Sequence, residues 1–83
     1  MNVEIIAARQ TINEANRICE RGLKSQVLSC CDRLFAHVQP LNKIRRTSRQ
    51  PDERQMADFL ISSCWASRVE LFNLLKRDAR PGV

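Results

Sequence analysis

The chain has 83 residues, of which 43% are hydrophobic and 28% are charged, and its formal net charge at pH 7 is +5. A chain of this length forms one domain with a small core, and this composition argues against intrinsic disorder and against a membrane-spanning helix. Only two glycines and three prolines occur, which disfavours a turn-rich all-β fold. Because the N-terminal residues lack the pattern of a signal peptide, we expect a cytoplasmic protein.

The first helix is predicted over residues 3–21. Its apolar side chains recur at alternating spacings of three and four, which places them on one helix face. These residues are Ile5, Ala8, Ile12, Ala15 and Cys19. Thr11 and Glu14 also fit a capping box, from which a shorter helix would begin at Thr11. The uninterrupted spacing favours the longer helix.

Gly22 raises the question of whether this helix ends or continues. A glycine in the left-handed conformation would end it in a Schellman motif, with Leu23 folding back on Ile18. Alternatively, Gly22 lies inside one continuous helix at a cost of about 1 kcal/mol. Both interpretations give the same core residues, and we favour the break.

The second helix is predicted over residues 25–38, with Ser25 as its N-cap. One apolar stripe follows it, formed by Val27, Leu28, Cys31, Leu34, Phe35 and Val38. Pro40 predicts its end, because the residue before a proline is pushed out of the α region. Residues 40–50 are then expected to form a polar connector. The connector carries a basic patch of Lys43, Arg45, Arg46 and Arg49.

The third helix is predicted over residues 51–77. Pro51 suits the first turn of a helix, and the acidic Asp52 and Glu53 that follow it favour the positive end of the helix dipole. Residues 79–83 are expected to be a frayed tail.

Two apolar stripes follow the third helix. The first, predicted to be core, consists of Met56, Phe59, Leu60, Cys64, Leu71, Leu74 and Leu75. The second consists of Ile61, Trp65, Val69 and Phe72 and points roughly the other way. It is either ordinary core or an intermolecular surface. We favour the surface, because helices packed on one side of a thin helix do not cover its opposite side. Arg68 and Lys76 border this stripe and are expected to form its polar rim.

The reactive side chains give little support for catalysis or metal binding. The four cysteines lie within helical patterns, so we expect reduced, structural thiols, and no C-x-x-C spacing predicts zinc. The single histidine, His37, is expected near the end of the second helix, beside its dipole. With no tyrosine and no glycine-rich phosphate loop, we expect no enzyme, no catalytic residues and no cofactor.

These observations predict an all-α fold, a small antiparallel three-helix domain. The alternative is a long helical hairpin that dimerises into a four-helix bundle. We expect a small protein-binding regulator (an adaptor, inhibitor or chaperone-like protein) that acts as a homodimer, and a partner with an acidic surface. A nucleic-acid-binding regulator that uses the basic connector on phosphates is the alternative function. No membrane interaction is expected.

Overall fold

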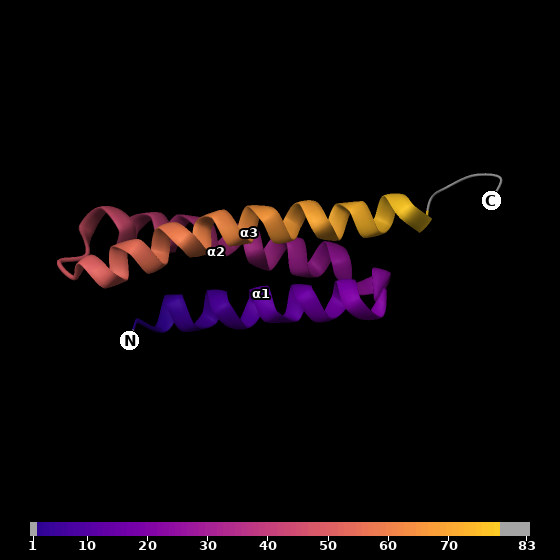
Figure 1. The fold of residues 1–83 in the computed structure, drawn as a ribbon, viewed down its shortest axis with the longest axis horizontal. Helices are drawn as coiled ribbons and strands as arrows, with labels where there is room; N and C mark the ends of the chain where they lie inside the picture. Colours follow the sequence, from indigo (N-terminus) through magenta and orange to yellow (C-terminus); the bar gives the residue numbers. More distant parts are fainter. Residues whose placement is uncertain (1, 79–83) are drawn as a thin grey trace.

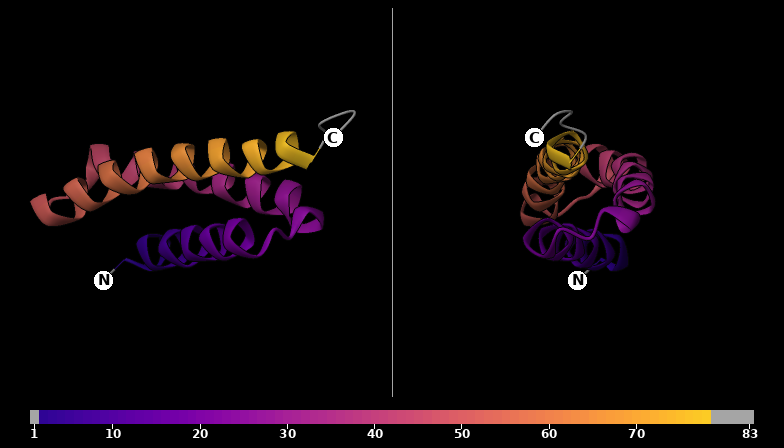
Figure 2. Two further views of the ribbon diagram at one scale, coloured as in Figure 1. Left: turned by 45° about the vertical axis from the view of Figure 1, so that its right-hand side comes forward. Right: turned by 90° about the vertical axis from the view of Figure 1, so that its right-hand side faces the viewer.

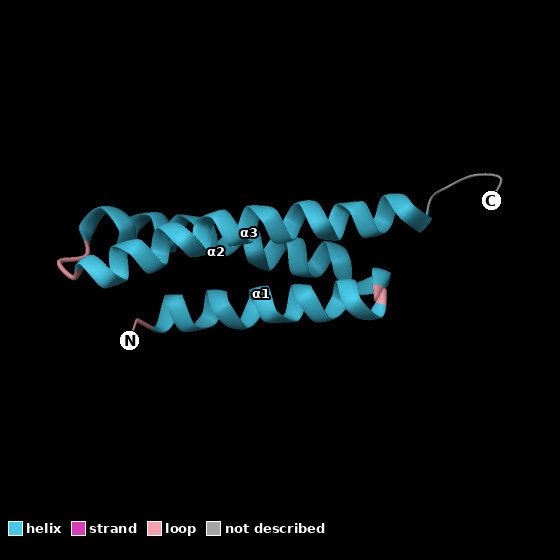
Figure 3. Ribbon diagram, viewed as in Figure 1, coloured by secondary structure: helices cyan, strands magenta, loops and turns pink. Residues whose placement is uncertain are grey.

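The structure is a computed structural model that describes residues 2–78, and its main elements are three α-helices (Figures 1 and 3). The elements in chain order are α1 (Val3–Arg21), the 3₁₀ turn η1 (Lys24–Gln26), α2 (Val27–Thr47) and α3 (Pro51–Asp78). No strand occurs in this part of the chain. The prediction of a small all-α, three-helix domain is therefore confirmed, whereas the predicted frayed tail, 79–83, lies outside the described residues.

The three helices run up, down and up along a common axis, and in the end-on view of Figure 2 they form a triangle. The molecule is elongated, with extents of 54 × 16 × 16 Å. α3 has 28 residues and α1 has 19, so α3 extends past α1 at both ends (Figure 1). The α2–α3 pair is the most extensive helix contact, and α1 packs against one side of it.

The core consists of apolar side chains from all three helices, which meet along the axis of the bundle. Its buried members are Ile5, Ala8, Ala15 and Ile18 of α1; Val27, Cys30, Cys31, Leu34, Leu41 and Ile44 of α2; and Ala57, Leu60, Cys64, Leu71 and Leu74 of α3. Alanines and cysteines lie among the larger side chains of this core and allow the helix backbones to approach closely.

Gly22 ends α1, as predicted. It adopts the left-handed conformation (φ 65°), and the N–H of Leu23 donates to the Ile18 carbonyl at 3.1 Å, as in a Schellman motif. The predicted cap of the second helix is wrong, however. Ser25 lies within η1, and α2 begins after Gln26 without a side-chain cap.

The predicted end of the second helix is also wrong, because α2 continues through Pro40 to Thr47. The missing N–H of Pro40 leaves the Ala36 carbonyl without its usual partner, but Ala36 is exposed, so water can satisfy that oxygen. In return, the extra turns bury Leu41 and Ile44 against the core. Burying two large aliphatic side chains outweighs one lost helical hydrogen bond.

Only residues 48–50 connect α2 to α3, and Ser48 organises them. Its hydroxyl donates to the Glu53 carboxylate at 2.8 Å and accepts from the backbone N–H of Gln50 at 3.2 Å. Arg54 donates to the Ser48 carbonyl at 2.7 Å. α3 then begins at Pro51, as predicted.

His37 lies in the middle of α2, ten residues before its end, and not beside the C-terminal dipole as expected. It is half-buried against α1, where its Nε2 lies 2.9 Å from the Thr11 hydroxyl oxygen. The Thr11 hydroxyl can also donate to the Ala7 carbonyl, whose oxygen lies 3.1 Å away, and the tautomer of His37 sets which residue donates in the His37–Thr11 pair. The pair is a polar link between α1 and α2.

Candidate protein-binding site

Five large apolar side chains gather on the side of the α2–α3 pair that α1 does not cover. They are Leu28 and Phe35 of α2 and Trp65, Val69 and Phe72 of α3, all exposed. Together with Arg68 they are named here the aromatic face. Leu28 lies seven residues before Phe35, and Phe72 seven residues after Trp65, so each pair occupies one flank of its helix over two turns.

Phe35 and Trp65 join the two helices across this face. Their ring centroids lie 5.9 Å apart with the rings at 75°, an edge-to-face arrangement. Phe35 nevertheless remains 56% exposed and Trp65 42% exposed. Because α1 covers the other side of the pair (Figure 2), this contact lies on the open side of the molecule.

Arg68 lies at the centre of the aromatic face. Its guanidinium carbon is 5.2 Å from the ring centroid of Phe35, 5.3 Å from that of Trp65 and 5.7 Å from that of Phe72. All three distances are within the range of cation–π attraction. The Nε atom of Arg68 is buried without a hydrogen-bond partner, and no carboxylate of residues 2–77 forms an ion pair with Arg68. The residue predicted as rim is therefore the centre of the site.

Helix geometry explains which residues of the second stripe reach the surface. At about 100° per residue, Trp65, Val69 and Phe72 project about 120–180° away from Leu60, whereas Ile61 projects only about 100° away. Ile61 is accordingly half-buried and packs against the core, unlike the prediction. The angle between the two apolar stripes around the axis of α3 is therefore smaller than 180°.

Phe59 was predicted to be core and is instead 65% exposed. It projects to the flank of α3 opposite Ile61, and there no helix covers it, whereas α2 covers the Ile61 flank. Phe59 is thus an exposed aromatic residue of α3 that lies outside the aromatic face.

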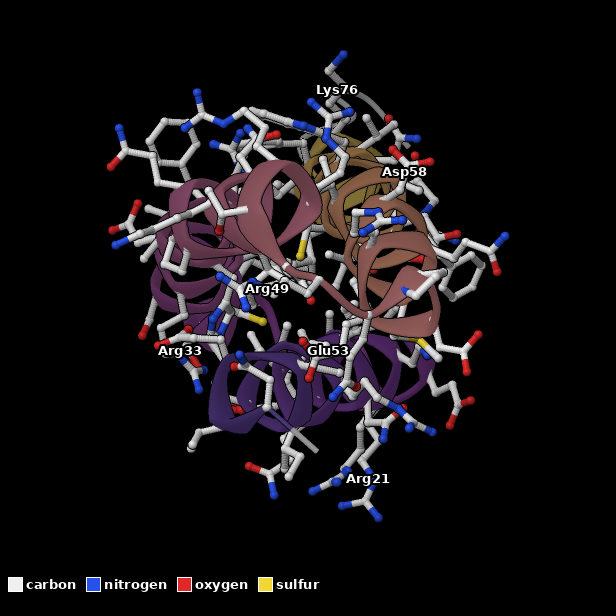
Figure 4. All side chains as sticks on the ribbon, turned by 90° about the vertical axis from the view of Figure 1, so that its left-hand side faces the viewer. Arg21, Arg33, Arg49, Glu53, Asp58 and Lys76 are labelled. Carbon is white, nitrogen blue, oxygen red and sulfur yellow. The ribbon has the colours of Figure 1, made fainter. Side chains whose placement is uncertain are left out.

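Three of the four residues of the predicted basic patch, Lys43, Arg45 and Arg46, line one open hollow on the surface of α2. Lys43, Arg45 and Arg46 lie on the last turns of α2 and Arg49 in the connecting segment, all exposed at the end of the molecule that faces the viewer in Figure 4. Arg45 also reaches α3, where its Nη1 lies 3.3 Å from the Asp58 carboxylate.

The cysteine, histidine and acidic side chains of the described residues are dispersed, and the thiols are buried or half-buried. No group of three or more histidine, cysteine or acidic side chains could hold a metal ion in this part of the chain. All four cysteines are unpaired, and burial raises the pKa of each thiol, that of Cys64 to about 11. Such thiols are protonated at neutral pH and are poor nucleophiles. No described helix is long and apolar enough to cross a membrane.

The sequence predicts the α3 residues of the aromatic face but not its two α2 residues. Leu28 and Phe35 were assigned to the core stripe of the second helix, although they lie at one edge of that wide stripe. Their shared position at its edge, seven residues apart, was the available signal. Comparisons with protein families, with curated proteins and with solved structures find no match to this chain.

Proposed function

We propose that this protein is a small non-enzymatic regulator that binds another polypeptide through the aromatic face. The observation that carries the proposal is the Arg68 guanidinium held among the exposed rings of Phe35, Trp65 and Phe72. Tryptophan, other aromatic residues and arginine are the side chains enriched at the centres of protein interfaces.

The distribution of exposed apolar side chains supports this site over the rest of the surface. Val3, Ile6 and Phe59 are also exposed, but none of them belongs to the aromatic face. Single exposed apolar residues are normal on soluble proteins, whereas a contiguous patch spanning two helices is typical of a binding site.

The net charge of +5 supports a partner with an acidic surface. Opposite charge on two proteins increases their rate of association and favours the correct partner over others. An adaptor, an inhibitor and a chaperone-like protein would all use a preformed helical face of this kind.

Capture of a native partner from a lysate of the source cells tests the proposal, with the immobilised protein compared with its variants. Trp65→Ala and Phe72→Ala should each weaken the binding of the captured protein tenfold or more. Phe59→Ala is the matched control, because it removes another exposed aromatic ring of α3 that lies outside the face. Circular dichroism verifies that each variant remains helical. Equal binding by all three variants would show that the aromatic face is not the binding site.

Nucleic-acid binding is the second candidate, favoured by four exposed cations at one end of the molecule: Lys43, Arg45, Arg46 and Arg49. The ion pair of Arg45 with Asp58 partly neutralises this end. If phosphates bind there, affinity for a DNA or RNA duplex should fall steeply with salt and be lost when Arg45, Arg46 and Arg49 are replaced by glutamine. Trp65→Ala should then have no effect.

A further inference from the structure

We infer that the aromatic face binds an amphipathic helix of another protein, and that this helix brings a carboxylate to Arg68. The inference rests on the proposed function and specifies the chemistry of the partner.

The carboxylate follows from the position of Arg68. Its guanidinium lies between 5.2 and 5.7 Å from three ring centroids, so any partner that covers these rings covers Arg68 as well. A guanidinium that is removed from water without a counter-ion is strongly destabilising, and no carboxylate of residues 2–77 forms an ion pair with Arg68. A purely apolar partner would leave that charge buried and unpaired. A partner with an aspartate or glutamate at this point would instead form a charge-assisted hydrogen bond, in the two-point form that arginine favours.

A helix is the occupant that the shape of the face favours. The face lies along two antiparallel helices whose other side already holds a helix, α1, so a further helix would complete a four-helix arrangement. Leu28 and Phe35, like Trp65 and Phe72, are separated by seven residues, about 10 Å along the helix axis. Apolar side chains at positions i, i+4 and i+7 of a partner helix span the same distance.

A second positive charge near the aromatic face also favours an acidic partner. Lys76 follows Phe72 by four residues and is exposed, and Figure 4 places it on the side of the α2–α3 pair away from α1. Lys76 is eight residues from Arg68, about 12 Å along the helix, so a second acidic side chain about two turns beyond the first carboxylate would meet a second positive charge.

A second copy of this chain fits the face less well. In a two-fold dimer that buries Trp65 against the partner's Phe72, the axis passes midway between these positions, beside Arg68. The two Arg68 guanidinium groups would then lie next to each other. This like-charge contact adds to the repulsion between two molecules that each carry +5.

Three synthetic peptides test the inference. Each is an amphipathic helix of about four turns with leucines at i, i+4 and i+7, and the peptides differ only in a central glutamate, glutamine or lysine beside the leucines. The fluorescence of Trp65, the single tryptophan, reports binding. The glutamate peptide should bind several-fold more tightly than the glutamine peptide and at least tenfold more tightly than the lysine peptide. Arg68→Gln should abolish this order, whereas Arg68→Lys should retain part of it.

Three results with the purified protein would overturn the inference. Equal affinity for the glutamate and glutamine peptides would show that the partner needs no carboxylate at Arg68. Absence of binding by all three peptides would show that the face does not bind an amphipathic helix. The third is a dimer in sedimentation equilibrium that Val69→Glu dissociates and Phe59→Glu does not, since the occupant would then be a second copy. A native partner whose capture depends on Trp65 but not on Arg68 would disprove this inference and leave the proposed function standing. Capture that does not depend on Trp65 would disprove the proposed function itself.

Discussion

The guanidinium of Arg33 and the carboxylate of Glu14 form a two-point ion pair that joins α2 to α1. The Nη1–Oε2 distance is 2.7 Å and the Nη2–Oε1 distance is 2.8 Å. The two bonds hold both side chains in one orientation and add to the contact that the core makes between the first two helices. The hydrogen bonds from Arg33 also lower the pKa of the Glu14 carboxyl below its ordinary value.

Glu14→Gln should therefore destabilise the protein in a pH-dependent way. Since the pKa of Glu14 is lower in the folded state, its contribution is present above the unfolded-state pKa and is lost as the pH falls through the folded-state pKa. Both side chains are partly exposed, so we expect a loss of only about 0.5–1 kcal/mol in the free energy of unfolding at pH 7. Urea unfolding followed by circular dichroism at pH 7 and at about pH 2 measures it.

The control is Glu20→Gln, which removes an exposed carboxylate from the same helix. It should have little effect at either pH. A deficit for Glu14→Gln that is the same at both pH values would show that the ion pair is not its cause.

Gly22→Ala should lower the free energy of unfolding by about 1 kcal/mol, because the φ of 65° is unfavourable for a residue with a Cβ. No atom lies within 4 Å of the position that a Cβ would take, so the cost is confined to the backbone. Gly22→Asn should cost less, since asparagine tolerates this conformation. Chemical denaturation of the three proteins measures both differences. Equal loss in the alanine and asparagine variants would point to a cause other than φ.

The cysteines should react with thiol reagents in an order set by burial. Cys19 is half-buried, whereas Cys30, Cys31 and Cys64 are buried, and burial raises the pKa of the Cys64 thiol to about 11. At pH 8, iodoacetamide should therefore modify Cys19 first and the other three only after unfolding in urea. Mass spectrometry of digested samples gives the order. Early modification of Cys64 would show that the core opens more readily than this packing implies.

Local signals predicted the helix boundaries where one residue determines the backbone. Gly22 and Pro51 did so, because a left-handed glycine and a first-turn proline each act within one helical turn. Pro40 gave a wrong helix end. Beyond Pro40, α2 is stabilised by contacts of Leu41 and Ile44 with the core, and a rule about neighbouring residues takes no account of such contacts.

The candidate site was only half predictable for the same reason. The spacing of Trp65, Val69 and Phe72 places them on one side of α3, but whether a flank is covered depends on where the neighbouring helices lie. This is why Ile61 packs against the core and Phe59 is exposed. The contact between Phe35 and Trp65 crosses two helices, so no periodicity within either helix predicts it.

Pro40→Ala should stabilise the protein, because alanine supplies an N–H for the Ala36 carbonyl and removes the clash of the proline ring with the preceding turn. Proline also restricts the unfolded chain, and losing that restriction offsets part of the gain. We expect a net increase of about 1–2 kcal/mol in the free energy of unfolding, seen as a higher Tm.

Pro51→Ala is the matched control for this change. Pro51 begins α3, where its missing N–H has no helical acceptor, so alanine gains no hydrogen bond there. Only the restriction of the unfolded chain is lost, and the variant should be less stable by up to about 1 kcal/mol. The two substitutions should thus shift the Tm in opposite directions. A destabilised Pro40→Ala variant would mean that a proline at this position is needed to bring Leu41 and Ile44 onto the core.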